Sequence, residues 1–249
     1  GKWGVYLLLM KNDELHSHLP ETMRANPANL ARMQEKYGEL IIKPINGSLG
    51  SGLIYLSKVN GEMWKVQYGQ SKRRSVQEES FTDNLPEIIL KKLKNNGYII
   101  QERIPLAAYR GNPFDIRVSV QRDGAGQWQV TGMVGKVAKP GGYVTNVARG
   151  GECMPMEDLL AELPHLDELQ VQNHIKRLSL KVAHTLSGGL SGLADIGLDI
   201  AITNEGFPMF IECNGRDLRY SFGSAGLQGL WKETYANPMR YARYLVDRK

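Results

Sequence analysis

The sequence predicts a mixed α/β fold built from β-hairpins and amphipathic helices. An Asn-Gly pair at 60–61 separates two apolar runs, residues 53–59 and 63–68, and such a pair is the strongest short signal for a hairpin. Residues 194–214 form a second pair of apolar runs about an Asn-Glu-Gly turn. Between the two hairpins, apolar side chains recur every three or four residues over 168–186, which is typical of a helix that covers a sheet.

The composition is that of a globular chain with a sizeable core. Of the 249 residues, 42% are hydrophobic and 23% charged, which leaves one domain or two closely packed domains open. The net charge of +5 is modest, and the Lys-Arg-Arg run at 72–74 lacks interleaved aromatic side chains, so we expect a solvated loop there and no nucleic-acid partner. The longest apolar run, residues 5–10, is too short to cross a bilayer, so we expect no membrane partner. Two cysteines without metal-ligand spacing favour a reducing, cytoplasmic compartment, and the oligomeric state stays open.

The remaining elements follow from local signals. A short helix is predicted over 2–12, and a second helix has Asn26 as its N-cap and Pro27 at its first position. We further expect a helix over 84–96, a terminal helix that begins at Asn237-Pro238, and strands at 40–45, 98–103, 114–118 and 127–136. The polar residues 69–83 predict a mobile segment, and 141–152 a long glycine-rich loop.

Three side chains with oxygen ligands converge in the second hairpin. Side chains alternate along a strand, so Glu212 and Asn214 share one face while Cys213, which we interpret as core packing, points to the other. The hairpin brings Asp199 opposite or diagonal to Glu212. Two carboxylates and an amide oxygen suit Mg²⁺, which also binds substrate phosphates. The alternative is that these acids lie at exposed strand ends.

A glycine-rich loop at 46–52 joins two predicted strands and contains Ser48, Gly50 and Gly52. It is neither a Walker loop nor a dinucleotide-binding loop, because both of those lead into a helix. Its backbone N–H groups and its serine can still approach phosphate oxygens closely. Lys43 before the loop and Lys65 across the hairpin can supply positive charge to the same phosphates. An ordinary glycine-rich turn is the alternative.

Polar side chains at three further places are candidates for ligand contact. The strand 98–103 ends in Gln-Glu-Arg, which can face an adenine and a ribose or simply enter solvent. Asp115 and Arg117 share one strand face, and Lys136 follows on the partner strand. Asn146 and Arg149 lie in the loop 141–152, where an arginine either reaches a charged ligand or remains a surface residue.

Taken in order, these segments resemble the ATP-grasp superfamily: a Lys-Pro before a glycine-rich loop, a Gln-Glu strand end, Asp-Ile-Arg, Asn-x-x-Arg-Gly-Gly, and a closing Asp…Glu-x-Asn. The Asp-Ile-Arg at 115–117 followed by residues 146–151 is similar to the branch of RimK, which ligates glutamate to protein termini. Residues 18–54 resemble the YheC/YheD family of endospore coat-associated proteins, and this likeness extends over nearly the whole chain. The resemblance implies an ATP-grasp fold in which two α/β subdomains with antiparallel sheets clamp ATP. It divides the chain into an N-terminal remnant, a nucleotide lid and a catalytic metal-binding subdomain, at 1–39, 40–103 and 104–249.

The same resemblance implies a role for each candidate side chain. ATP and one or two Mg²⁺ ions would be the cofactors, with the metal on Asp199, Glu212 and Asn214. The phosphates would be bound by Lys2, Lys43, Lys65 and the loop with Ser48, Gly50 and Gly52. The adenine and ribose would lie against Gln101, Glu102, Arg103 and Ile104, and the nucleotide-binding set is completed by Asp115 and Asn146. Developing negative charge would be stabilised by Arg117, Arg149 and Lys136.

The implied activity is that of an ATP-dependent carboxylate–amine ligase that acts through an acyl phosphate. Its substrates would be an amino acid, a peptide or a protein terminus, with Arg216 and Arg219 binding the substrate carboxylate. RimK-like enzymes continue past the asparagine with Ser-Pro-Gly, whereas residues 215–219 read Gly-Arg-Asp-Leu-Arg, so we expect a different acceptor site. A kinase and a non-catalytic, ATP-binding spore-coat protein are the alternatives. Since the chain begins at Gly1 without the subdomain that usually precedes the nucleotide lysine, we expect it to be a piece of a longer protein.

Overall fold

Two antiparallel sheets, each packed against helices, organise the structure. The computed structural model describes residues 1–47, 50–69, 76–142, 145, 150–215 and 217–248. The chain divides into two parts, which we call unit 1 (Gly1–Tyr6 and Pro20–Arg103) and unit 2 (Leu7–Leu19 and Ile104–Lys249). No helix in the described part of the chain combines the length and apolar character needed to cross a bilayer.

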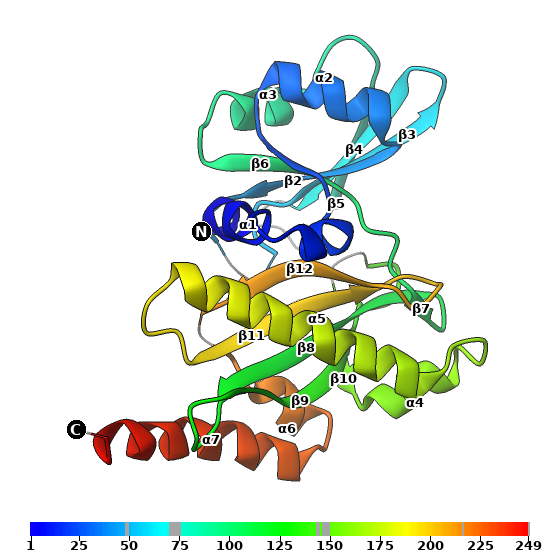
Figure 1. The fold of residues 1–249 in the computed structure, drawn as a ribbon. Coiled ribbons are helices and arrows are strands. Elements are labelled where there is room, and N and C mark those ends of the chain that lie inside the picture. The colour runs from blue at the N-terminus through cyan, green and yellow to red at the C-terminus, as the bar shows by residue number, and fades with distance from the viewer. Residues whose placement is uncertain (48–49, 70–75, 143–144, 146–149, 216, 249) are drawn as a thin grey trace. The chain divides into compact units, whose positions relative to one another are not determined.

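Unit 1 contains a sheet with the strand order β1-β6-β2-β3-β4-β5 (Figure 1). The strands are β1 (Thr22–Arg24), β2 (Glu39–Pro44), β3 (Ile54–Asn60), β4 (Met63–Gly69), β5 (Val76–Phe81) and β6 (Tyr98–Glu102). The chain begins in α1 (Lys2–Leu9), and the sheet is covered by α2 (Pro27–Lys36) and α3 (Glu87–Leu93). As the sequence predicts, the Asn26 side chain caps α2 by accepting a hydrogen bond from the Asn29 backbone N–H at 2.8 Å.

Strand alternation gives the unit 1 sheet an apolar and a polar face. The apolar face joins α2 and α3 in one core, which includes Leu30, Met33, Leu40, Ile42, Ile54, Val66, Ile89 and Ile100. The strand register places Lys43, Lys65 and Gln101 on the opposite face. The candidate nucleotide residues Lys43 and Lys65 therefore lie on the face of the sheet opposite α2 and α3.

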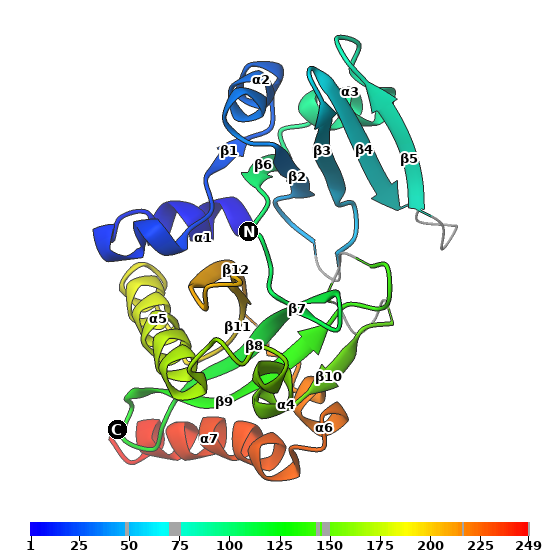
Figure 2. The same cartoon turned by 90° about the vertical axis from the view of Figure 1, so that its right-hand side faces the viewer.

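Unit 2 contains a sheet with the strand order β10-β9-β8-β11-β12, and β7 pairs with β8 (Figure 2). The strands are β7 (Ala108–Tyr109), β8 (Asn112–Arg122), β9 (Trp128–Val137), β10 (Glu152–Met154), β11 (Asp195–Ile202) and β12 (Pro208–Asn214). The helices are η1 (Asp13–His18), α4 (Met156–Ala161), α5 (Glu168–Gly189), α6 (Tyr220–Ser224) and α7 (Gln228–Val246). Helix α5 covers one face of the sheet, and α6 and α7 pack against part of the other (Figures 1 and 2).

The apolar stripe of α5 supplies much of the unit 2 core. Its predicted members are buried: Val171, Ile175, Leu178, Val182 and Leu186. They pack on the sheet face that carries Phe114, Ile116, Val118, Ile196, Leu198 and Ile200, all of them fully buried. The interpretation of this helix as a cover for the sheet is confirmed.

Three predicted elements differ from the structure. Residues 76–81, predicted to be mobile, form β5, which pairs with β4 and buries Phe81. The terminal helix α7 starts at Gln228, so the prediction of a start at Asn237-Pro238 is wrong. Asn237 is buried and donates to Thr131 Oγ1 at 3.0 Å, a tertiary contact that holds Pro238 inside a helix. Helix α3 begins at Glu87 and not at 84, because Pro86 disfavours helical geometry in the residue before it, and it ends at Leu93.

We expect Ile175→Ala to lower the free energy of unfolding by about 2–5 kcal/mol, because the fully buried side chain would leave a cavity under α5. The neighbouring Lys176 is exposed, so Lys176→Ala should change the stability by less than about 0.5 kcal/mol. Urea unfolding followed by circular dichroism measures both variants. Equal losses would contradict this packing of α5.

Candidate functional site

Six candidate residues lie together on the polar face of the unit 2 sheet: Asp115, Arg117, Lys136, Asp199, Glu212 and Asn214. The register pairs Asp115 with Lys136, and Arg117 with Asp199. It also pairs Asp199 with Glu212, so these two carboxylates are directly opposite, one of the two registers that the sequence allowed. Cys213 pairs with Leu198 on the α5 side, and burial first, then the nearby carboxylates, raises its thiol pKa to about 12.

The Asp199 carboxylate is the centre of this group. Arg117 donates to both of its oxygens, from Nε to Oδ1 at 2.7 Å and from Nη2 to Oδ2 at 3.2 Å. Lys136 Nζ donates to Oδ1 at 2.9 Å, and Asn214 Nδ2 lies 3.5 Å from Oδ2. The three charged side chains are 6–10% exposed, so solvent ions screen their attraction only weakly.

The electrostatics of the cluster follow from burial and ion pairing together. Burial disfavours the ionised form of Asp199, but Arg117 and Lys136 outweigh it and hold the pKa of that carboxyl below its usual range. Burial also disfavours the charged forms of Arg117 and Lys136, and the adjacent carboxylates outweigh it and raise both pKa values. The two cations are therefore held in the charged state by the acids beside them.

Asp115 is the second acid of the cluster. Its Oδ1 forms an ion pair with Lys136 Nζ at 2.9 Å, and Thr145 donates to its Oδ2. Burial is the largest effect on this carboxyl and raises its pKa, while Lys136 opposes the rise. Asp115 and Asp199 thus share the Lys136 ammonium group between them.

A third acid, Asp217, joins the cluster although the sequence did not single it out. Its Oδ1 accepts from Arg117 Nη1 at 3.3 Å, and its Oδ2 accepts from the Ser119 hydroxyl. Its side chain is fully buried, and burial raises its carboxyl pKa. In the sequence, Asp217 lies between Arg216 and Arg219 in the segment 215–219, which departs from the RimK pattern. That departure predicts a different acceptor site but assigns no role to Asp217.

Gly197 makes room for this third acid. A Cβ atom on Gly197 would lie 2.6 Å from Asp217 Oδ1 and 3.2 Å from Arg117 Nη1. Because Gly197 has no side chain, the Arg117–Asp217 ion pair can lie directly against β11.

In unit 1, Lys43 is held by a buried chain of hydrogen bonds. Lys43 Nζ donates to Gln101 Oε1 at 2.6 Å, and Gln101 Nε2 donates to Thr22 Oγ1 at 2.7 Å. The Thr22 hydroxyl donates to the Pro20 carbonyl at 2.9 Å. The side chain of Gln101, predicted to face adenine, thus orients the Lys43 ammonium group across β1, β6 and β2.

Four other candidates of unit 1 are Lys2, Lys65 and the loop residues Gly50 and Gly52. Lys2 Nζ donates to the Gly47 carbonyl at 2.7 Å, and the Lys2 backbone N–H donates to Ile45 at 2.9 Å. Gly50 and Gly52 have φ values of 65° and 72°, a backbone region that side chains other than glycine rarely adopt. Lys65 Nζ lies 3.3 Å from Glu78 on β5.

The remaining candidates make contacts outside the Asp199 cluster and the Lys43 hydrogen-bond chain. Glu102 lies near the Tyr37 hydroxyl, whose pKa is raised by burial and by the adjacent carboxylates. Arg103 pairs with Glu39 at 2.8 Å, and Ile104 is buried. Arg219 pairs with Asp195 and donates to the Thr234 carbonyl at 2.9 Å. Four candidates lie outside the described residues: Ser48, Asn146, Arg149 and Arg216.

The donor set on the unit 2 sheet fits Mg²⁺ in kind. Among the described residues of the cluster, three buried carboxylates face two cationic groups, and Glu212 adds a fourth carboxylate, so the excess charge is negative. Among the described residues, no group of three His, Cys, Asp or Glu side chains is arranged to hold a metal ion. A metal site here therefore requires the Asn214 amide oxygen as a third ligand. Glu212, Asn214 and Asp199 Oδ2 are the oxygen ligands that would hold the ion.

Comparison with known proteins gives one matching family and two similar curated proteins. The family model described as YheC/D like ATP-grasp matches residues 1–245. The chain is 24% identical over 249 residues to the endospore coat-associated protein YheD of Bacillus subtilis (strain 168), covering 99% of this chain and 54% of YheD. It is 21% identical over 248 residues to YheC of the same organism, covering 99% of this chain and 67% of YheC. The chain thus spans about half the length of YheD.

Solved structures with a similar fold include ATP-grasp ligases. The ligase PsnB, complexed with a phosphomimetic variant of its minimal precursor, Mg and ADP, has a TM-score of 0.53 at 16% identity, over 94% of this chain and 58% of PsnB. The D-cycloserine synthetase DcsG has a TM-score of 0.53 at 14% identity, over 99% of this chain and 71% of DcsG. The predicted ATP-grasp fold is confirmed.

We expect Gly197→Ala to lower the free energy of unfolding by about 1–3 kcal/mol, because the new methyl group must displace the Asp217–Arg117 pair. Gly229→Ala is the matched control: a Cβ at Gly229 meets no atom within 4 Å, so no loss is expected. Thermal and urea unfolding measure both variants.

A double-mutant cycle tests the cause of that loss. In an Asp217→Ala background the obstructing carboxylate is gone, so Gly197→Ala should cost clearly less than in the wild-type chain. Additive losses would contradict the close approach of Asp217 to β11.

Proposed function

The chain belongs to the YheC/D-like ATP-grasp family, and on this premise we propose that it is an ATP-dependent ligase that joins a carboxylate to an amine. The observation that carries the proposal is the buried cluster in which Arg117 and Lys136 are held charged by acids on one sheet face. Such a cluster suits a reaction in which negative charge develops on phosphate oxygens. The similarity of the fold to the ligases PsnB and DcsG supports the same class.

The proposed reaction has two steps. A carboxylate oxygen of the substrate attacks the γ-phosphorus of ATP, the bond from the γ-phosphorus to the bridging oxygen breaks, and ADP leaves. The amine then attacks the carbonyl carbon of the acyl phosphate, a C–N bond forms, inorganic phosphate leaves, and the amine loses a proton to water. Both steps depend mainly on positioning and charge stabilisation, so no nucleophilic side chain is required.

The residues of unit 2 would supply charge to these steps. Arg117 and Lys136 would stabilise the transferring phosphoryl group, and Arg149 is proposed to join them. Asp115, Asp199 and Asp217 would fix the directions of the two cations. Mg²⁺ held by Asp199, Glu212 and Asn214 would neutralise phosphate oxygens and polarise the γ-phosphorus.

The residues of unit 1 would bind the nucleotide. Lys43, oriented by Gln101, is the proposed first phosphate contact, and Lys2, Lys65 and the loop with Ser48, Gly50 and Gly52 would add to it. We propose the strand end formed by Glu102 and Arg103, with Ile104, as the adenine and ribose contact, together with Asp115 and Asn146. For the substrate carboxylate we propose Arg216, with Arg219 positioning the same segment through its ion pair with Asp195.

A second candidate is a non-catalytic, ATP-binding protein of the spore coat. Two observations favour it. The relatives YheD and YheC are named endospore coat-associated proteins. In addition, both oxygens of Asp199 already accept hydrogen bonds from protein side chains, which a metal ion must partly replace.

The test is release of ADP and free phosphate from Mg-ATP, screened against amino acids, short peptides and spore-coat extract. We expect amine-dependent phosphate release that Glu212→Gln lowers by about a hundredfold or more, because a ligand of the metal loses its charge. Glu205→Gln is the matched control, since it makes the same change at an exposed position of the same hairpin and should leave the rate unchanged.

Three other outcomes would overturn the ligase proposal. Formation of ADP with a phosphorylated acceptor and no free phosphate would identify a kinase. ATP binding without turnover against any acceptor would favour the coat-protein candidate. Equal losses in Glu205→Gln and Glu212→Gln would show that the acidic hairpin has no specific role.

A further inference from the structure

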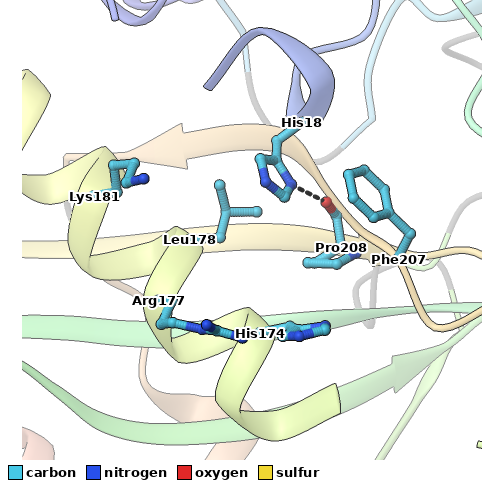
Figure 3. Close-up of a pocket in the computed structure, with 7 residues that line it drawn as sticks. All are labelled: His18, His174, Arg177, Leu178, Lys181, Phe207 and Pro208. Atoms are coloured by element: carbon cyan, nitrogen blue, oxygen red, sulfur yellow. Dashed lines mark hydrogen bonds between the residues drawn. The ribbon is translucent and has the colours of Figure 1, made fainter. Parts of the chain in front are cut away.

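Unit 2 has a second candidate site, a largely apolar pocket of about 310 Å³ at the edge of the sheet. We call it the η1–α5 pocket, because His18 of η1 lines it together with side chains of α5 and the start of β12 (Figure 3). Four basic side chains surround an apolar floor, and the volume is at the lower end of the range for small-molecule sites, about 300–1,000 Å³.

The η1–α5 pocket is separate from the Asp199 cluster. Its floor residue Leu178 belongs to the buried stripe of α5, and Pro208 pairs with Ile202 of β11. Ile202 alternates with Asp199 along β11, so the pocket opens on the α5 side of the sheet. A ligand bound there would not touch the proposed catalytic residues.

One wall of the pocket is fixed before any ligand binds. His18 Nδ1 lies 2.7 Å from the Pro208 carbonyl oxygen, which can only accept, so Nδ1 carries the proton and donates. The other ring nitrogen of the neutral imidazole, Nε2, is then an acceptor, so the ring itself and not Nε2 would contact an anion's apolar body. The imidazole stacks on the Phe207 ring at 4.7 Å between centroids and 4° between planes. Figure 3 shows the His18 and Phe207 rings next to each other.

The α5 wall of the pocket carries three basic side chains, and the charge of one of them, Arg177, is not paired within the described residues. His174, Arg177 and Lys181 are spaced three and four residues apart, so they share one side of α5. Lys181 pairs with Glu14 at 2.6 Å. Among the described residues, Arg177 makes no ion pair or hydrogen bond, so its guanidinium group can bind an anion in two-point fashion.

We propose that the η1–α5 pocket binds a small organic anion with a flat or apolar body. Arg177, with Lys181 beside it, would take a carboxylate or phosphate group, and the body would pack on Leu178 and on the stacked rings of Phe207 and His18. This site is independent of the proposed ligase reaction, because it uses none of the same residues. The wall already formed by His18 reduces the ordering cost of binding.

The test uses three probes on the full chain: benzoate, phenyl phosphate and inorganic phosphate. Binding is followed by NMR shifts of the His18 and His174 rings and by titration calorimetry. We expect one or both aromatic anions to bind more tightly than inorganic phosphate, and the benzoate and phenyl phosphate arms tell a carboxylate ligand from a phosphate ligand. Arg177→Gln should weaken the better probe by about tenfold, the effect of losing a charge-assisted hydrogen bond.

Lys176→Gln is the matched control, because it removes the same charge from an exposed position next to Arg177 that does not line the pocket. It should leave the affinity within about twofold of the wild-type value, the scale of an exposed charge. Phe207→Ala should weaken the aromatic probes but not inorganic phosphate. No ring shift with any probe up to about 10 mM, or equal losses in Arg177→Gln and Lys176→Gln, would overturn the proposal.

Discussion

The ion pairing of the Asp199 carboxylate is the interaction on which the polar face of unit 2 depends. Moving a carboxylate or a cationic side chain out of water costs several kcal/mol per ion, so none of these groups is stable there alone. Arg117 and Lys136 offset the cost for Asp199, and the acids offset it for them. Gly197 and Asp217 complete the arrangement, because the glycine leaves the space that the second partner of Arg117 occupies.

In both units, one face of the sheet is apolar and packs against helices, and the other face carries charged and polar side chains. In unit 1, α2 and α3 bury one face, and the other presents Lys43 in a fixed direction through Gln101 and Thr22. In unit 2, α5 buries one face, and the other concentrates charge. The apolar faces supply the stability that lets the opposite faces carry groups whose burial is costly.

The polar face of unit 2 offers charge and oxygen ligands and no nucleophilic side chain among its described candidate residues. The described part of the site offers fixed positive charges and oxygen ligands, which are the parts that phosphoryl transfer needs. The η1–α5 pocket lies on the α5 side of the same sheet, and the small organic anion that we propose for it would bind away from the Asp199 cluster.

The sequence by itself determined the family, the two hairpins and helix α5, because the turn signals and side-chain periodicities are local. It left Asp199 opposite or diagonal to Glu212, and only the strand register of the structure placed the two acids directly opposite. It missed β5 and the start of α7, whose residues lack a strong local signal and are fixed by distant strands. Only the tertiary structure decided that Asp217 binds Arg117 and that Gln101 orients Lys43, contacts that join residues 100 and 58 positions apart. The roles of the site residues remain predictions, because long-range contacts place a side chain, whereas its chemistry depends on the ligand it meets.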